Sequence, residues 1–147
     1  MRREEILSLS PKDTEVAALK LAESISGGEL ILSSGPLGAG KTAFFKGLAR
    51  ALGVKRTVNS PTFNLIKVYK GSSLTLYHVD CYRLEGVDEE EKGLYLDDLL
   101  GEKDSLVYVE WPLFAPKMIL DRHPRIELDF EVVDEETRRI GILDERQ

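Results

Sequence analysis

The eight residues from Gly35 to Thr42 constrain this chain most, and they read Gly-Pro-Leu-Gly-Ala-Gly-Lys-Thr. They match the pattern G-x-x-x-x-G-K-[ST], in which a glycine-rich turn directs backbone N–H groups at a phosphate. In such a loop we expect Lys41 to reach the β- and γ-phosphates and the Thr42 hydroxyl to bind Mg²⁺. Gly38 and Gly40 supply the positive φ angles that the turn requires.

The segments on either side of this loop predict a strand and a helix. Residues 29–33 predict a short buried strand, and residues 43–52 a helix with Phe44, Leu48, Ala51 and Leu52 on one face. Gly53 stands where such a helix ends. This order places the positive end of a helix dipole at the phosphate, which favours a nucleotide site over a chance match to the pattern. We predict that the nucleotide is bound by Gly35, Pro36, Leu37, Gly38, Ala39, Gly40, Lys41, Thr42 and Ala43.

The rest of the chain predicts an α/β protein. An edge strand at residues 5–9 precedes a helix that starts at Ser10 and Pro11, in which Val16, Leu19, Ala22 and Ile25 recur at helical spacing. Residues 65–69 and 74–80 predict an antiparallel hairpin, and residues 86–94 and 95–100 predict helices. Residues 105–110 predict a strand buried on both faces. Residues 126–132 predict a half-buried strand, with its partner at residues 140–142. We expect one domain, residues 1–147, with a three-layer fold like that of P-loop NTPases and a mixed, partly antiparallel central sheet. Its ligand site should lie at the carboxyl ends of the central strands.

Composition argues against several functional classes. The 147 residues carry 20 basic and 26 acidic side chains, a net charge of −6, which disfavours strong binding of DNA or RNA by this chain alone. One cysteine, Cys81, excludes an internal disulfide framework. No apolar run approaches the ~18 residues that a membrane span needs, and the first residues do not resemble a signal peptide. We therefore expect a cytoplasmic protein without membrane contact.

Two carboxylates end predicted strands. Glu110 follows an apolar strand, as does the carboxylate that holds magnesium in many nucleotide-binding proteins, although a solvated strand end is the alternative. Asp80 shares a strand face with His78 and either serves the site or caps or pairs locally, for instance with Arg83. Residues 60–63 (Ser-Pro-Thr-Phe) form either a loop that senses the γ-phosphate or a plain turn. Trp111 is either a packing residue or an aromatic wall beside the nucleotide.

Four motifs follow one another along the chain: Gly35–Thr42, Ser-Pro-Thr-Phe at 60–63, Tyr-His-Val-Asp-Cys-Tyr-Arg-Leu at 77–84, and Glu-Trp-Pro at 110–112. The set closely resembles the TsaE family, the small ATPase of bacterial tRNA threonylcarbamoyladenosine biosynthesis. The similarity covers nearly the whole chain and is far more specific than the phosphate loop alone, which many unrelated families share.

The resemblance implies an ATPase that uses ATP and Mg²⁺, with Thr42 and Glu110 as metal ligands. Lys41, Asp80 and Glu110 would be its catalytic residues, and Ser60, Pro61, Thr62 and Phe63 a switch-like loop. ATP would also contact Trp111 and, at the adenine, residues around Ser10 with Arg138 or Arg139. The implied partners are TsaB and TsaD, of which TsaD transfers threonylcarbamoyl to the adenosine beside the anticodon. The protein would contact tRNA only indirectly, through its complex with TsaB and TsaD.

Two other functional classes share the phosphate loop. A small metabolite or nucleoside kinase is one, although such kinases usually carry a lid with arginines, and the segment after Asp80 is acidic and offers only Arg83. A nucleotide-gated binding module without enzymatic activity is the other. No N-K-x-D stretch is present, so the sequence disfavours GTP.

Overall fold

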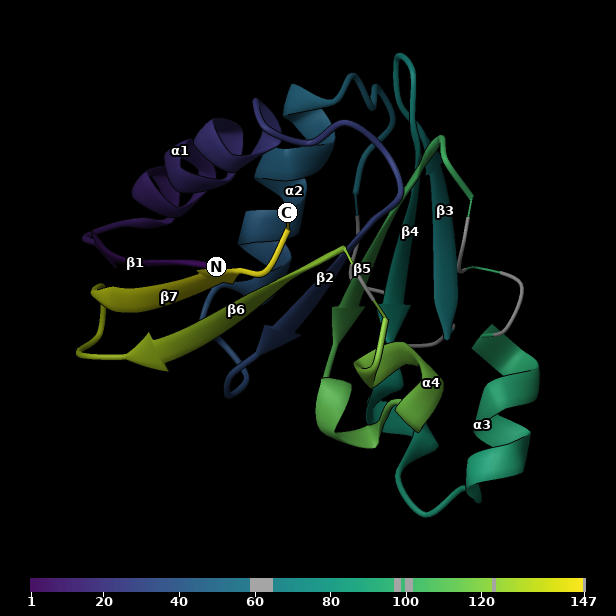
Figure 1. The fold of residues 1–147 in the computed structure, drawn as a ribbon. Helices are drawn as coiled ribbons and strands as arrows, with labels where there is room; N and C mark the ends of the chain where they lie inside the picture. Colours follow the sequence, from purple (N-terminus) through teal and green to yellow (C-terminus); the bar gives the residue numbers. More distant parts are fainter. Residues whose placement is uncertain (59–64, 97–98, 100–101, 123, 147) are drawn as a thin grey trace.

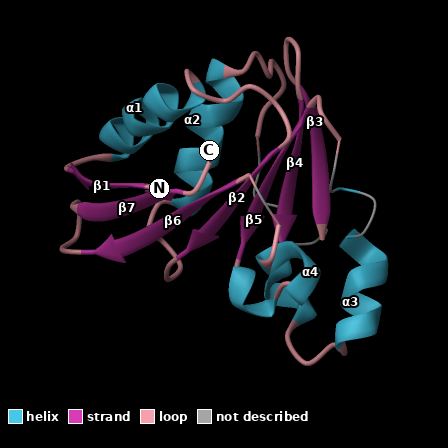
Figure 2. Cartoon of the chain, viewed as in Figure 1, coloured by secondary structure: helices cyan, strands magenta, loops and turns pink. Residues whose placement is uncertain are grey.

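A seven-stranded mixed sheet with the strand order β1-β7-β6-β2-β5-β4-β3 forms the centre of the molecule (Figures 1 and 2). The computed structural model describes residues 1–58, 65–96, 99, 102–122 and 124–146. The inner strands, β2 (Glu29–Ser34), β5 (Ser105–Glu110), β4 (Thr75–Asp80) and β6 (Arg125–Val132), pair in parallel. The outer strands, β3 (Ile66–Lys70), β7 (Arg138–Asp144) and β1 (Arg2–Ser8), pair antiparallel. The predicted mixed sheet and the predicted edge strand at the N-terminus are confirmed.

Helices cover both faces of this sheet and make the predicted three layers. On one face α1 (Pro11–Ala22) and α2 (Lys41–Ala51) pack on alternate strand residues such as Ile31, Leu106 and Tyr108. The other face carries the shorter elements η1 (Cys81–Leu84), α3 (Glu89–Leu96), η3 (Pro112–Phe114) and α4 (Lys117–Leu120). Their side chains pack on the intervening residues, among them Leu32, Val107 and Val109. Alternation along the strands therefore supplies two separate cores. In the described part of the chain, no helix combines the length and apolarity that crossing a membrane requires.

Helix α1 is confirmed, but its buried face differs from the apolar spacing read in the sequence. Val16 and Leu19 are 55% and 50% exposed, whereas Ala17 and Ala18 are buried. The reason is the close approach of α1 to α2: a Cβ placed on Gly47 would lie 2.8 Å from Cβ of Ala18. Only small side chains fit between helices so close together, and the larger apolar residues are left outside.

The remaining boundaries differ from the predictions in small ways. In α2, Phe44 and Leu48 are buried as predicted, but Ala51 is exposed and Phe45 is buried instead. The acidic helix α3 runs from Glu89 to Leu96 and includes the start of the second helical piece predicted at 95–100. Residues 97, 98 and 100 of that piece lie outside the described residues, as does the loop at 59–64. The buried side chain predicted for Cys81 is confirmed.

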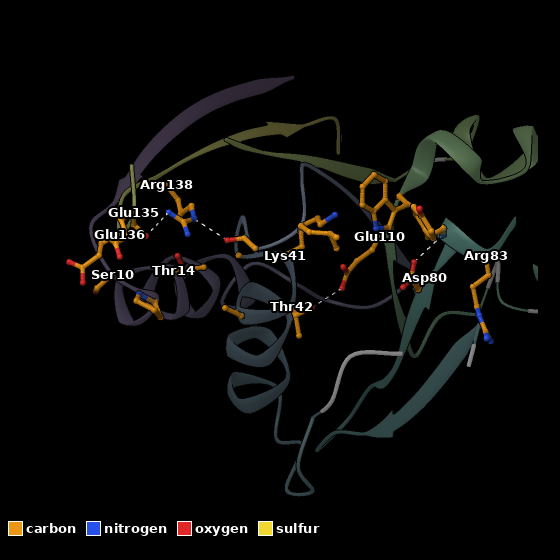
Figure 3. Close-up of a pocket in the computed structure, with 17 residues that line it drawn as sticks. Ser10, Thr14, Lys41, Thr42, Asp80, Arg83, Glu110, Glu135, Glu136 and Arg138 are labelled. Carbon is orange, nitrogen blue, oxygen red and sulfur yellow. Dashed lines mark hydrogen bonds between the residues drawn. The ribbon is translucent and has the colours of Figure 1, made fainter. Parts of the chain in front are cut away.

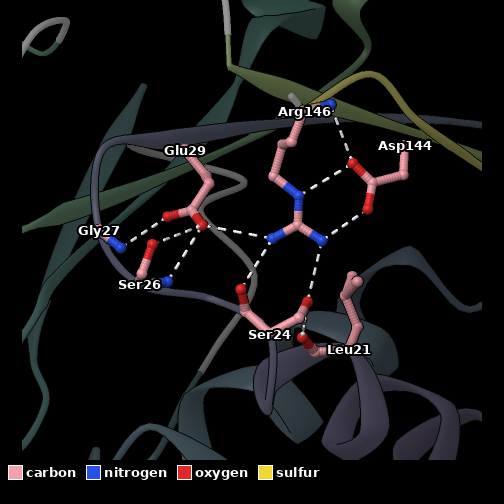
Figure 4. A network of polar contacts seen from close by, with 7 residues as sticks. All are labelled: Leu21, Ser24, Ser26, Gly27, Glu29, Asp144 and Arg146. Atoms are coloured by element: carbon pink, nitrogen blue, oxygen red, sulfur yellow. Dashed lines mark hydrogen bonds and ion pairs between the residues drawn. The ribbon is translucent and has the colours of Figure 1, made fainter. Parts of the chain in front are cut away.

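A polar network ties the end of β7 to the connection between α1 and β2 (Figure 4). Arg146 donates from Nη2 to Asp144 Oδ2 (2.6 Å) and from Nη1 to the carbonyl of Ser24 (2.9 Å). It also pairs with Glu29 at 3.3 Å, whose carboxylate accepts from the backbone N–H of Gly27 at 2.7 Å. The hydrogen bonds from Arg146 lower the pKa of Asp144 to about 2. The C-terminal strand is thereby joined to the segment that leads into β2.

Candidate nucleotide site

A cavity of about 700 Å³ opens at the carboxyl ends of β2, β4 and β5, where the sequence predicted the ligand site (Figure 3). The phosphate loop and the start of α2 line it together with the ends of β4 and β5, the start of α1 and the turn between β6 and β7. Its volume lies in the range of small-molecule sites. Ten predicted residues meet there: Ser10, Leu37, Gly38, Gly40, Lys41, Thr42, Ala43, Asp80, Glu110 and Trp111.

Three other loop positions and the switch residues do not belong to this lining. Gly35 contributes a carbonyl that binds Lys41 rather than a wall of the cavity, and Ala39 is fully buried beneath the loop. Pro36 does not line the cavity either. The predicted switch-like residues Ser60, Pro61, Thr62 and Phe63 lie outside the described part of the chain.

The phosphate loop has the backbone that its glycines predict. Gly38 and Gly40 have φ angles of +77° and +108°, in the region that favours glycine. Gly40 is also the N-cap residue of α2 and carries no side chain that could accept from the first N–H groups of the helix. The first residues of α2, Lys41, Thr42 and Ala43, line the cavity at the positive end of the helix dipole, an arrangement suited to an anion.

Lys41 lies deep in this arrangement, only 4% exposed. Its Nζ donates to the carbonyl of Gly35 at 2.6 Å and lies 3.9 Å from the centroid of the Trp111 ring. Burial lowers the pKa of Lys41, while the charges of Glu110 and Asp80 act to raise it. Trp111 is the sole non-glycine residue with a positive φ (58°) in the part of the chain that the structure describes. Strained backbone of this kind gathers at functional sites, and here it holds the indole over the lysine.

Glu110 is a buried carboxylate rather than a solvated strand end. Its side chain is 7% exposed, and its Oε2 accepts from the Thr42 hydroxyl at 3.4 Å. The same oxygen lies 2.5 Å from Nε2 of His78, a fully buried residue of β4. His78 was predicted to share a face with Asp80, but its contact with Glu110, 32 residues away in the chain, was missed. Only the side-by-side pairing of β4 and β5 brings the two together.

Asp80 stands directly beside Glu110, since the two are register partners at the ends of β4 and β5. Its Oδ1 accepts from the backbone N–H of Tyr82 at 3.0 Å and so caps η1. Burial raises the pKa of Asp80, the Tyr82 hydrogen bond lowers it, and the charge of Glu110 raises it further. Asp80 therefore caps a helical turn, as one of the two alternatives from the sequence has it, and its side chain also lines the cavity.

The opposite end of the cavity includes Arg138, one of the two arginines that the family resemblance implied, and three residues that the sequence did not predict. Thr14 lies one turn after Ser10 on α1, Glu135 and Glu136 come from the β6–β7 turn, and Arg138 begins β7. Arg138 reaches across to the phosphate loop, where its Nε donates to the carbonyl of Gly38 at 3.2 Å. No local motif marks these residues; only the return of β7 beside β6 brings them near the loop.

Several known proteins match this chain in sequence. A family model described as "Threonylcarbamoyl adenosine biosynthesis protein TsaE" matches residues 8–140. Among curated proteins, the "tRNA threonylcarbamoyladenosine biosynthesis protein TsaE" of Bacillus subtilis is 41% identical over 71% of this chain. The alignment spans 63% of that relative's own length. The protein of the same name from Aquifex aeolicus is 36% identical, and the alignment covers 94% of both chains.

A solved structure agrees with the sequence relatives. The crystal structure of Bacillus subtilis YdiB superposes with a TM-score of 0.75 at 29% identity, covering 97% of this chain and 86% of that one. The predicted family and the predicted fold class are thus both confirmed. The chain belongs to the TsaE family.

Proposed function

We propose that this protein binds and hydrolyses ATP with Mg²⁺ and serves tRNA threonylcarbamoyladenosine biosynthesis together with TsaB and TsaD. One observation carries the proposal: Lys41, Thr42, Asp80 and Glu110 converge on a single cavity at the carboxyl ends of parallel strands. The chain's family and the names of its relatives support the pathway. The ATP hydrolysis and the partnership with TsaB and TsaD are open to direct tests.

The phosphates of ATP are proposed to lie on the loop. The N–H groups at the start of α2 and the ammonium of Lys41 supply the positive charge there, and Lys41 would exchange the Gly35 carbonyl for phosphate oxygens. At the other end of the cavity, Ser10, Thr14 and Arg138 would contact the nucleoside.

Thr42 and Glu110 are the residues that would hold magnesium. Both offer hard oxygen ligands within one hydrogen bond of each other, which suits this cation. Among the described residues no group of three or more His, Cys, Asp or Glu side chains is arranged to hold a metal. This fits Mg²⁺, which usually takes one or two protein ligands and completes its shell with phosphate oxygens and water. When bound, it neutralises charge on the β- and γ-phosphates.

Asp80 is proposed to orient the attacking water. Its carboxylate lines the cavity beside Glu110, yet its backbone partner Tyr82 occupies only Oδ1. Neither arginine of the lining is aimed at the phosphates in the part of the chain that the structure describes: Arg138 donates to the Gly38 carbonyl, and in Figure 3 the Arg83 side chain points away from Lys41. Because cationic groups and water placement supply most of the rate in phosphoryl transfer, we expect slow hydrolysis by the isolated chain.

The test is steady-state ATP hydrolysis by the pure protein and after addition of TsaB and TsaD. We expect slow turnover alone and a marked rise with both partners, together with copurification that depends on ATP. Turnover of ~1–100 s⁻¹ by the chain alone, typical of kinases and unchanged by the partners, would contradict partner-completed catalysis. That outcome would favour the metabolite or nucleoside kinase instead.

A further inference from the structure

His78 is a buried polar residue that the proposed reaction does not yet use. Its side chain is 0% exposed and does not line the cavity, so it cannot touch a nucleotide. The ring stacks on Phe45 with centroids 4.1 Å apart and meets Tyr108 edge-on at 5.6 Å. Two aromatic neighbours therefore fix the orientation of the imidazole, and its Nε2 faces Glu110 at 2.5 Å.

The surroundings of the ring define which nitrogen carries the proton. Nδ1 is buried and has no hydrogen-bond partner among the described residues. A doubly protonated ring would leave an N–H at Nδ1 without an acceptor, which is costly in a buried position. An ionised carboxylate only accepts hydrogen bonds. A neutral ring whose Nε2–H donates to Oε2 of Glu110 pairs the contact at Nε2 and leaves no N–H group buried without an acceptor.

We propose that His78 is a positioning residue that presets Glu110 for magnesium, an inference that rests on the proposed function. The hydrogen bonds from His78 and from the Thr42 hydroxyl both end on Oε2. No described residue donates to Oε1, which leaves this second oxygen available to a cation. Without the Nε2–H bond the carboxylate could rotate away, and part of the binding free energy of the metal would be spent on ordering it. Hydrogen-bond partners of metal ligands typically change metal affinity by about 10–100-fold.

The test compares the Mg²⁺ concentration that half-saturates ATP binding in three variants. His78→Phe keeps an aromatic ring against Phe45 but removes the donor, and we expect its midpoint to rise about tenfold or more. His78→Gln keeps an N–H donor of similar reach and should restore much of the loss. Leu76→Ala is the matched control, because Leu76 is fully buried on the same face of β4 and its loss lowers stability without touching Glu110. ATP affinity in EDTA should stay within about threefold of wild type in all three, since the effect acts through the metal.

A double mutant distinguishes positioning from a general structural effect. If His78 acts through Glu110, His78→Phe should raise the midpoint no further in a protein that already carries Glu110→Gln. If the increases in the Mg²⁺ midpoint from His78→Phe and Glu110→Gln added up, or if His78→Phe kept the wild-type midpoint, the inference about His78 would be overturned. Either result would leave the binding of Mg²⁺-ATP by the wild-type protein unaffected. A wild-type protein that binds no ATP would overturn the proposed function and this inference with it.

A measurement on the unmutated protein covers the case in which His78→Phe does not fold. The chain has two histidines, so a His123→Gln variant assigns the imidazole signals in long-range ¹H–¹⁵N spectra. We expect a neutral ring protonated at Nε2 with a slowly exchanging proton. A ring protonated at Nδ1 would overturn the proposal.

Discussion

The carboxylate of Glu110 and that of Asp80 stand side by side, yet their contacts differ and predict different roles. Glu110 bonds to Thr42 and His78 inside the protein, whereas Asp80 bonds to the backbone of η1. We expect Glu110→Gln to raise the Mg²⁺ midpoint for ATP binding about tenfold or more, because the amide loses the negative charge that attracts the cation. Glu131→Gln, which removes the same charge from an exposed site beside Arg139, should leave the midpoint unchanged.

Asp80→Asn should affect hydrolysis rather than binding. The substitution removes the charge that would orient the attacking water but keeps an oxygen for the Tyr82 N–H. We expect Mg²⁺-ATP affinity within about threefold of wild type and hydrolysis slower by on the order of 10²-fold, the usual size of such positioning effects. Single-turnover assays with saturating protein separate the two quantities. A variant that hydrolyses normally but needs more Mg²⁺ would show that the roles of the two carboxylates are reversed.

Between elements, α1 and α2 approach each other closely where they cross at Gly47. An added Cβ there would meet Ala18 at 2.8 Å and the backbone oxygen of Glu15 at 2.9 Å. Gly47→Ala should therefore lower the free energy of unfolding by about 1–3 kcal/mol, the usual cost of overpacking, although alanine is the better helix former. Gly93→Ala in α3 is the matched control: its nearest neighbour is the Met118 sulfur at 3.5 Å. It should raise stability by roughly 0.5–1 kcal/mol. If urea unfolding gave the same change in unfolding free energy for Gly47→Ala and Gly93→Ala, α1 and α2 would be able to move apart without cost, and the prediction would be wrong.

The network around Arg146 stabilises the joint between β7 and the α1–β2 connection. Arg146→Met should cost about 2 kcal/mol at neutral pH, because it leaves the buried Glu29 and the partly buried Asp144 without the guanidinium. Arg139→Met is the control, since Arg139 pairs with the exposed Glu5 and Glu131, and should cost at most about 1 kcal/mol.

The pH dependence of this joint follows from Asp144. Its pKa is lowered from 3.8 to about 2 in the folded protein. The stabilisation is therefore present above pH 3.8 and is lost as the pH falls toward 2. The difference in unfolding free energy between wild type and Arg146→Met should narrow over that range. A constant difference in chemical unfolding across that range would contradict the assignment.

Across the whole molecule, the sequence predicted the helices and strands that the local spacing of apolar residues encodes. The strand, loop and helix from Glu29 to Ala51, the hairpin of β3 and β4, and the strand ending at Glu110 are all present. The buried face of α1 was not predictable, because Ala17 and Ala18 are buried only where Gly47 of another helix lets them approach. The contacts of His78 with Glu110 and of Arg138 with Gly38 depend on strand pairing between distant segments, which no local pattern contains.

The proposed function requires that the cavity beside the phosphate loop binds Mg²⁺-ATP through Lys41. Calorimetric titration of ATP in Mg²⁺ into the wild-type protein and into Lys41→Ala tests it most directly. We expect one saturable site in the wild type and an affinity lower by at least about tenfold in the variant, since each charge-assisted hydrogen bond to phosphate contributes about 1.5–3 kcal/mol. Thermal unfolding verifies that the variant is folded. A folded Lys41→Ala protein that binds Mg²⁺-ATP as tightly as the wild type would contradict the claim.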